Sequence, residues 1–207
     1  MIVRLIVRLI VCVASLALIA GCRQGPSRVA APSWNPDDFA DAILEKLDKN
    51  TDSAVDMTEV AAAPGLAWGA VYIDTDKNKS LSRDELVARF EMYRNRQVGL
   101  TSKQMQLSYK GRPLSGAKVT LVPEYFLADV IEPAAGEADA AGMVSPVTQG
   151  AEVPGVRAGY YRVVVESPNV KVPAKYASAD STPIGVEISG VGDDPRSYGT
   201  IQLVLRD

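Results

Sequence analysis

The stretch DTDKNKSLSRDE, residues 74–85, places oxygen-bearing side chains at alternate positions of a short polar segment. Acid, amide or hydroxyl groups stand at its first, third, fifth, seventh and ninth places, and its last two places are Asp84 and Glu85. One aliphatic residue, Leu81, interrupts this run at the eighth place. The segment DKNTDSAVDMTE, residues 48–59, starts 26 residues earlier and aligns with it without a gap, with Val55 at the matching place. This repeat predicts two copies of one structural unit.

Oxygen atoms at alternate places of a loop can converge on one hard cation. Calcium takes about six to eight oxygens at about 2.3 to 2.6 Å, and a short loop supplies them by wrapping once around the ion. The predicted ligands of the first loop are Asp48, Asn50, Asp52, the backbone carbonyl of Ala54, Asp56 (directly or through water) and both oxygens of Glu59. Those of the second loop are Asp74, Asp76, Asn78, the backbone carbonyl of Ser80, Ser82 and Glu85.

Both segments resemble the twelve-residue calcium loop of EF-hand proteins, D-x-[DN]-x-[DN]-G-x5-E. The resemblance implies calcium as the cofactor, and it implies that Val55 and Leu81 join the paired loops as a small antiparallel ribbon. The sequence departs from the family at the sixth place, where Ser53 and Lys79 replace glycine. A left-handed non-glycine residue costs on the order of 1 kcal/mol, so we expect a loss of affinity of about tenfold or less. An extracytoplasmic calcium module is in any case expected to bind weakly, with Kd of roughly 0.1 to 1 mM. The second loop has three acids among its ligand places against four in the first, so we expect it to bind more weakly.

A metal-free interpretation explains part of the same pattern. Asp56 with Glu59, and Ser82 with Glu85, have the spacing of a helix capping box, in which two side chains satisfy free backbone N–H groups. Capping accounts for the last four residues of each loop. It does not account for the alternating oxygens that precede them in both copies.

The flanking segments have helical periodicity. Residues 37–47 and 84–97 each place apolar residues on one face, and EVAAAPGLAWGAVYI between the loops fits two short helices broken at Pro64 and Gly65. The sequence therefore predicts an all-α EF-hand pair over residues 37–98. The apolar faces comprise Phe39, Ile43, Leu47, Leu86, Phe90 and Tyr93, and we interpret Trp68, Tyr72 and Phe90 as packing residues.

From residue 103 onward the apolar residues alternate as in strands. MQLSY and AKVTLVP lie on either side of a Gly-Arg-Pro turn and predict a hairpin, with Val119 and Leu121 facing inward and Lys118 and Thr120 facing outward. GYYRVVVESP, PIGVEIS and TIQLVLRD predict three further strands. Residues 124–155 are read as an irregular connection or a short helix. The expected fold class is α+β in two domains, with the EF-hand pair followed by an antiparallel β-sandwich over residues 103–207.

Three segments of this second half resemble the carboxypeptidase regulatory-like, or transthyretin-like, domain that recurs in secreted bacterial lipoproteins. They are KGRPLSGAKVTLVP, ADAAGMV and VRAGYYRVVV. The resemblance implies a sandwich that serves as a stalk or an adhesive module, with an envelope protein or a glycan as partner. It implies no catalytic residue.

The first 22 residues, MIVRLIVRLIVCVASLALIAGC, have the layout of a secretory signal. Ile19-Ala20-Gly21-Cys22 resembles the lipobox of bacterial lipoproteins, which implies a signal peptide over residues 1–21 and a lipid on Cys22. Residues 22–36 would then form a flexible tether, and the membrane would be a partner through that lipid. A membrane-spanning anchor and an ordinary signal with a chance cysteine remain alternatives. The lipobox implies an extracytoplasmic location in the bacterial cell envelope.

Composition argues against two other classes of protein. The chain has no histidine and a formal charge of −3, which becomes −5 when Arg4 and Arg8 leave with the signal, so we expect no nucleic-acid partner. Without histidine, a free internal thiol, G-x-S-x-G or a P-loop, we expect no enzyme. We interpret GVGDDP, residues 190–195, as a turn.

The predicted function is a lipid-anchored, extracytoplasmic calcium-binding protein. The alternative is a metal-free structural or adhesive lipoprotein of the cell envelope.

Overall fold

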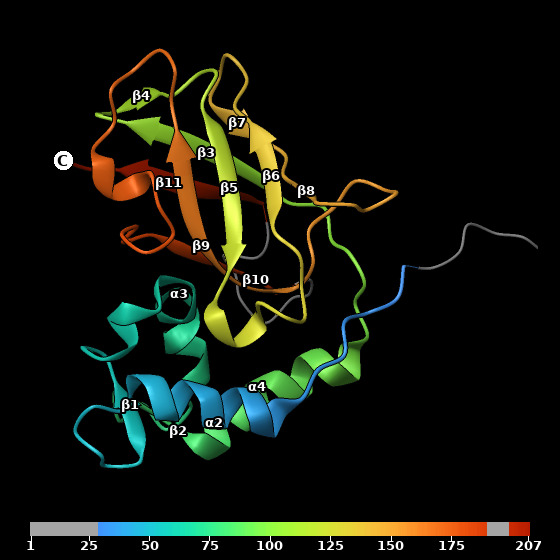
Figure 1. Ribbon diagram of the computed structural model, residues 1–207, viewed down its shortest axis with the longest axis vertical. Coiled ribbons are helices and arrows are strands. Elements are labelled where there is room, and N and C mark those ends of the chain that lie inside the picture. The colour runs from blue at the N-terminus through green and yellow to red at the C-terminus, as the bar shows by residue number, and fades with distance from the viewer. Residues whose placement is uncertain (1–28, 190–198) are drawn as a thin grey trace, which may run out of the picture.

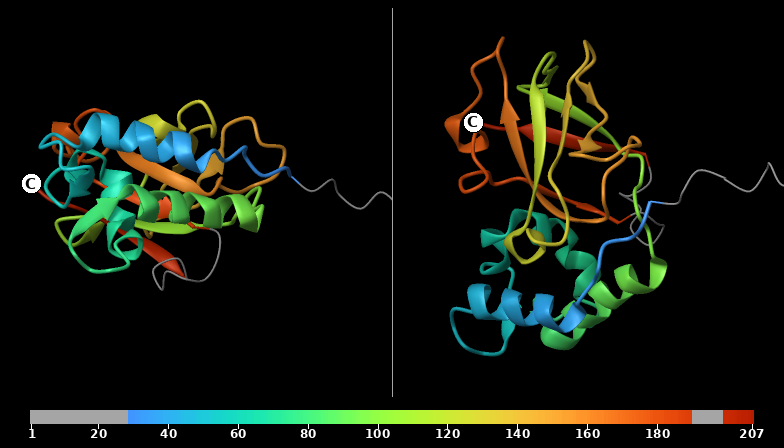
Figure 2. Two further views of the ribbon diagram at one scale, coloured as in Figure 1. Left: turned by 90° about the horizontal axis from the view of Figure 1, so that it is seen from below. Right: turned by 45° about the vertical axis from the view of Figure 1, so that its right-hand side comes forward.

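The computed structural model describes residues 29–189 and 199–207 (Figure 1). The predicted signal peptide, Cys22, the first residues of the tether and the GVGDDP turn lie outside these ranges. The protein has an α+β fold, and both figures of the whole chain show its helices gathered at one end of the β-sheets (Figure 1, Figure 2). Within the described ranges, no helix has the length and apolar character needed to cross a membrane.

The helical part is formed around two loops. Its elements are α2 (Pro36–Leu47), β1 (Ala54–Asp56), the 3-10 helix η1 (Val60–Ala62), α3 (Pro64–Ile73), β2 (Ser80–Ser82) and α4 (Arg83–Arg96). The predicted helices over 37–47 and 84–97 are confirmed to within a residue at each end. The predicted break between the two middle helices falls at Ala63, and Pro64 and Gly65 begin α3. A proline fits there because the first N–H groups of a helix have no intrahelical partner.

Aromatic rings form the core of the helical part. All six apolar residues predicted on the faces of the two outer helices are buried. Phe90 is fully buried, whereas Trp68 is half-buried against the core. Trp34, which the sequence placed in the tether, is also buried, and its ring stacks on that of Tyr93 with the centroids 4.8 Å apart. The packed part of the chain therefore begins before residue 37.

The β part consists of two sheets. The five-stranded antiparallel sheet has the order β10-β9-β5-β6-β8, and the second sheet has the order β11-β3-β4 with β7 also paired to β3. The strands are β3 (Gln104–Tyr109), β4 (Arg112–Pro113), β5 (Lys118–Pro123), β6 (Ala134–Glu137), β7 (Met143–Val144), β8 (Val147–Thr148), β9 (Gly159–Glu166), β10 (Gly185–Ile188) and β11 (Thr200–Leu205). Two 3-10 helices, η2 (Tyr125–Leu127) and η3 (Ala174–Tyr176), lie in the connections. The predicted inward faces of Val119 and Leu121 are confirmed, since both are fully buried.

The predicted pairing of MQLSY with AKVTLVP is wrong. β3 turns at Lys110 and Gly111 into the short strand β4, and β5 pairs with β6 and β9 in the other sheet. Lys110 and Gly111 both have positive φ, 50° and 73°, as a two-residue hairpin turn of the primed type requires. The alternating pattern predicted which residues face inward, but it contains no information about the partner strand.

The β part also differs from a purely antiparallel sandwich. β11 pairs with β3 in parallel over its whole length, from Thr200 opposite Gln104 to Leu205 opposite Tyr109. In addition, β6, β7 and β8 lie within residues 124–155, where no strand was predicted. β6 has the sequence Ala-Ala-Gly-Glu, and these residues have low strand propensity.

The helical and β parts share one hydrophobic core. The ring of Phe90 on α4 meets the rings of Phe126 and Tyr160 edge-on, with centroids 5.8 Å and 5.9 Å away. Beside these rings, Arg89 of α4 forms an ion pair with Glu187 of β10, with Nη2 and Oε1 2.6 Å apart. Their side chains are 8% and 0% exposed. The helices are therefore attached to the sheet by both apolar and charged contacts.

Gly69 of α3 determines how closely that helix approaches the ion pair. A Cβ atom there would lie 2.6 Å from Oε2 of Glu187 and 2.8 Å from Cε1 of Tyr160. We predict that Gly69→Ala lowers the free energy of unfolding by up to about 2 kcal/mol, because overpacking costs about 1 to 3 kcal/mol and better helix propensity returns about 1 kcal/mol. Urea unfolding measures the change. The control Val71→Ala, on the same helix at a side chain 67% exposed, should change it by less than about 0.5 kcal/mol. A Gly69→Ala variant that is more stable than the parent would show that α3 moves away from β10 and relieves the contact.

Candidate metal centre

The two loops meet through the β1–β2 ribbon. The pairing is antiparallel, with Ala54 opposite Ser82, Val55 opposite Leu81 and Asp56 opposite Ser80. Val55 and Leu81 are both fully buried. The predicted ribbon at the eighth place of each loop is confirmed, and it places the two loops side by side.

The acids of the first loop accept hydrogen bonds from the backbone of the same loop. The carboxylate of Asp48 accepts from the N–H groups of Asp52 at 3.2 Å and Ser53 at 2.9 Å. The side-chain oxygen of Asn50 accepts from the Asp52 N–H at 2.9 Å, and that of Asp52 accepts from the Ala54 N–H at 3.0 Å. The side-chain oxygens of Asp48, Asn50 and Asp52 are therefore held by N–H groups of their own loop.

The second loop repeats this pattern position by position. Asp74 accepts from the N–H groups of Asn78 and Lys79, both at 3.0 Å. Asp76 accepts from the Asn78 N–H at 3.0 Å, and Asn78 accepts from the Ser80 N–H at 2.7 Å. The match extends from the sequence to the hydrogen bonds, so the two copies adopt one conformation.

A glutamate at the twelfth place closes each loop. Oε1 of Glu59 accepts from the Lys49 N–H at 2.8 Å, and Oε2 accepts from the Asp56 N–H at 3.0 Å. Oε1 of Glu85 likewise accepts from the Thr75 N–H at 2.7 Å, and Oε2 accepts from the Ser82 N–H at 3.0 Å. One carboxylate thus links the start of each loop to its end.

The acids of the second loop come together in space. Asp74, Asp76 and Glu85 each offer a carboxylate oxygen within 4.8 Å of the others. Within residues 29–189 and 199–207, the acids of the first loop form no comparable group of three. One difference is the third place, which is Asn50 in the first loop and Asp76 in the second. The remaining predicted ligands lie in the ribbon: Ala54, Asp56, Ser80 and Ser82 are residues of β1 or β2.

Both capping interactions are present as well. Ser82 and Glu85 form a capping box at the start of α4. In the first loop, Oδ1 of Asp56 accepts from the Glu59 N–H at 2.9 Å while Glu59 accepts from Asp56. Partial burial raises the pKa of Glu85, but the hydrogen bonds from Ser82 and Thr75 outweigh burial and lower that pKa to about 2. Glu85 is therefore ionised at neutral pH.

Thr75 is a residue that the sequence reasoning missed. Its hydroxyl donates to Oε1 of Glu85 at 3.0 Å, beside the bond from its own N–H. The first loop has Lys49 at this second place, so it lacks the hydroxyl. A hydroxyl residue directly after the first acid was the available signal.

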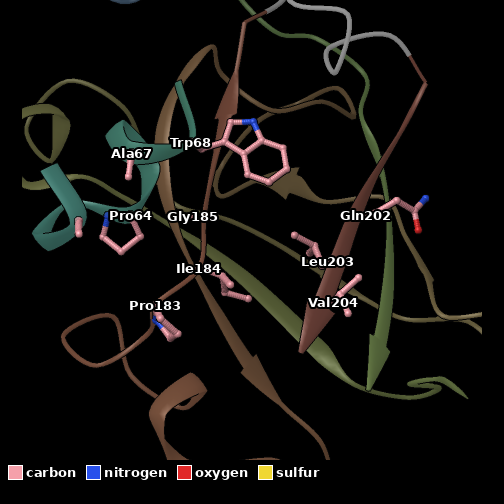
Figure 3. A pocket seen from close by; sticks show the side chains of 10 residues that line it. Pro64, Ala67, Trp68, Pro183, Ile184, Gly185, Gln202, Leu203 and Val204 are labelled. Atoms are coloured by element: carbon pink, nitrogen blue, oxygen red, sulfur yellow. The ribbon is translucent and has the colours of Figure 1, made fainter. Parts of the chain in front are cut away.

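A separate pocket of about 400 Å³ lies between α3, β10 and β11 (Figure 3). Its lining residues are Ala61, Pro64, Ala67, Trp68, Pro183, Ile184, Gly185, Gln202, Leu203 and Val204. None of them is an acid, a base or a cysteine, and Gln202 is the polar member. The pocket offers mainly apolar contact, and none of its lining side chains is titratable.

No protein-family model, curated protein or solved structure matched this chain in the comparisons with known proteins.

The sixth place of each loop has the backbone conformation that glycine favours. Ser53 has φ 70° and Lys79 has φ 69°. We predict that, without metal, Lys79→Gly is more stable to urea than Lys79→Ala by about 1 kcal/mol, because alanine keeps the Cβ that is strained at positive φ. Both variants lack the ammonium group, so their difference isolates the backbone. Equal stabilities would mean that this place relaxes to negative φ in the alanine variant.

The lowered pKa of Glu85 has a consequence for acid stability. A carboxylate whose folded pKa is about 2, against an ordinary value of 4.5, contributes stability above pH 4.5 and loses it as the pH falls through 2. We predict that the stability advantage of the parent over Glu85→Gln, measured by urea unfolding with a chelator present, is constant above pH 5 and shrinks toward pH 2. The control Glu91→Gln, at a half-exposed carboxylate of α4 outside both loops, should cost less stability at neutral pH than Glu85→Gln. An advantage of the same size at every pH would contradict the assigned role of the ionised carboxylate.

Proposed function

We propose that the two loops bind calcium. One observation carries this proposal: two twelve-residue segments with the same spacing of oxygen ligands adopt the same hydrogen-bonded turn and meet through a buried ribbon. Each carboxylate oxygen has more than one lone pair, so an oxygen that accepts an N–H bond can still coordinate a cation. Oxygen ligands of this kind suit a hard cation such as calcium.

The helical part would then be an EF-hand pair, and the β part would be a carboxypeptidase regulatory-like sandwich. The ligand set is the one predicted from the sequence, with Asp74, Asp76 and Glu85 as its best-supported members because their oxygens converge. The β part would serve as a spacer or as a surface for an envelope protein or glycan. The lipobox at Cys22 supports an anchor in the membrane of a bacterial cell envelope.

The metal-free structural role is supported by a different observation. The acids at the first and last places of both loops already accept backbone N–H bonds, and the capping box at α4 is complete. If the acids serve only to accept these hydrogen bonds, the loops are rigid turns that need no ion. Calcium titration separates the two functions.

We predict that the chain starting at Arg23, which retains every described element, binds calcium with Kd in the range of about 0.1 to 1 mM. Calcium that binds only the folded state should raise its free energy of unfolding by about 2.7 kcal/mol for each occupied loop at one hundred times Kd. Calorimetric titration and thermal unfolding measure the two effects. Glu85→Gln should remove the second site and Glu59→Gln the first, because each loses a ligand that supplies two oxygens.

Glu91→Gln is the matched control, since it removes one exposed carboxylate of α4 outside both loops. It should leave calcium binding and the calcium-dependent stability unchanged. Absence of heat and of thermal stabilisation at millimolar calcium in the parent would favour the metal-free role. Equal losses in all three variants would indicate nonspecific attraction to the acidic surface.

A further inference from the structure

The two helices that flank the second loop are both fixed to the β part by buried carboxylates. α4 begins at Arg83, within the last three residues of this loop, and carries Glu85, Arg89 and Tyr93 at intervals of four residues. Residues at this interval lie one above the other along a helix. The closing glutamate of the loop is therefore one turn away from Arg89 and two turns away from Tyr93.

Arg89 and Tyr93 both contact Glu187 of β10. Nε and Nη2 of Arg89 donate to Oε1 of Glu187 at 3.1 Å and 2.6 Å, and the Tyr93 hydroxyl donates to the same oxygen. Burial is the main cause that raises the pKa of Tyr93, so this hydroxyl keeps its proton and remains a donor. A guanidinium that gives two N–H groups to one carboxylate holds the helix in a defined orientation.

α3, on the other side of the loop, packs against the same carboxylate and is held by a second one. Gly69 leaves room for Glu187 against the helix, and the Gly65 N–H donates to Oε1 of Glu124 at 2.8 Å. Asp74, the first predicted ligand, follows α3 directly, and its N–H donates to the Ala70 carbonyl at 2.9 Å. The first and last ligands of the second loop thus stand on helices whose positions β10 and its neighbours determine.

The attachments on the two sides of the first loop differ. After this loop, η1 is held by β9, because Nη2 of Arg162 donates to the Ala62 carbonyl at 2.9 Å. α2, which precedes the loop, contacts η2 through a hydrogen bond from the half-buried Tyr125 hydroxyl to the Ala42 carbonyl at 3.3 Å. Lys46 lies over the ring of Tyr125, with Nζ 4.0 Å from the centroid. Within the described residues, no buried ion pair links α2 to the β part.

We propose that Glu187 and Arg89 are positioning residues for cation binding at the second loop. By fixing α4 on β10 they hold Glu85 in register with Asp74 and Asp76, so the loop does not have to order these ligands when the ion binds. This inference rests on the proposed calcium function. By linkage, calcium at the second loop stabilises the attachment of α4 to β10 by the same factor.

The test uses Glu59→Gln as the parent, so that only the second loop binds calcium. Glu187→Gln in this parent should weaken calcium binding by about fivefold or more, measured by calorimetric titration of protein shown to be folded by circular dichroism. Val119→Ala is the matched control, because it removes buried volume from β5 and leaves the contacts of Glu187 in place. It should lower stability while changing calcium Kd by less than about twofold.

Arg89→Lys is the second variant, and it also serves if Glu187→Gln fails to fold. It keeps the charge but loses the two-donor contact, so it should weaken calcium binding by less than Glu187→Gln. A calcium Kd unchanged in both variants would overturn the inference and leave the proposed function standing. Equal weakening by Val119→Ala would also overturn it, since the effect would then follow from global stability. No calcium binding by the unmodified chain would overturn both proposals.

Discussion

The constraint on which the helical part depends is the closure of each loop by one glutamate. A twelve-residue turn that contains only a three-residue strand leaves many backbone N–H groups without regular partners, and unpaired groups are costly when they are removed from water. Glu85 accepts from Thr75 near the start of its loop and from Ser82 near its end, and Glu59 does the same in the first copy. Loop closure therefore fixes where α4 begins relative to the end of α3. The positions of Arg89 and Phe90 on the surface of the β part follow from that starting point.

The attachment of the helices to the sheets joins two kinds of interaction with different physical roles. The rings around Phe90 supply nondirectional apolar contact, which would tolerate rotation of α4 about its own axis. The Arg89–Glu187 pair does not tolerate such rotation, because both of its side chains are almost fully buried and an unpaired charge there would be strongly unfavourable. A buried pair of this kind is weak evidence for added stability, since its desolvation offsets much of its attraction. Its effect here is better described as selection of one orientation of α4.

Local patterns allowed the loops and the helices to be predicted, whereas contacts between distant segments could not be. The ligand spacing, the ribbon at Val55 and Leu81 and the buried faces of the helices follow from periods of two and of 3.6 residues. The Arg89–Glu187 pair joins residues 98 positions apart and has no local signal. The parallel pairing of β11 with β3 was missed because alternation specifies which side chains face inward, and both strand directions satisfy it. The burial of Trp34 was missed because proline, serine and small residues surround it and resemble a tether.

The excess of acid over what capping requires is the physical reason to favour a cation at the second loop. The capping box needs Ser82 and Glu85, and the N–H groups inside the turn donate to Asp74, Asp76 and Asn78. An amide oxygen at residue 76 could accept as well as a carboxylate, as that of Asn50 does in the first loop. Asp76 adds a third carboxylate oxygen within 4.8 Å of the other two. Two like charges at this separation repel by roughly 1 kcal/mol in a water-like medium and by roughly 3 to 4 kcal/mol at an effective dielectric constant of 20. Backbone N–H groups reduce this repulsion but bring no net charge, whereas a divalent cation converts each repulsive pair into two attractive contacts. A turn whose only role was rigidity would be more stable with asparagine at residue 76, because a neutral amide avoids this repulsion. The first loop has asparagine at the equivalent place.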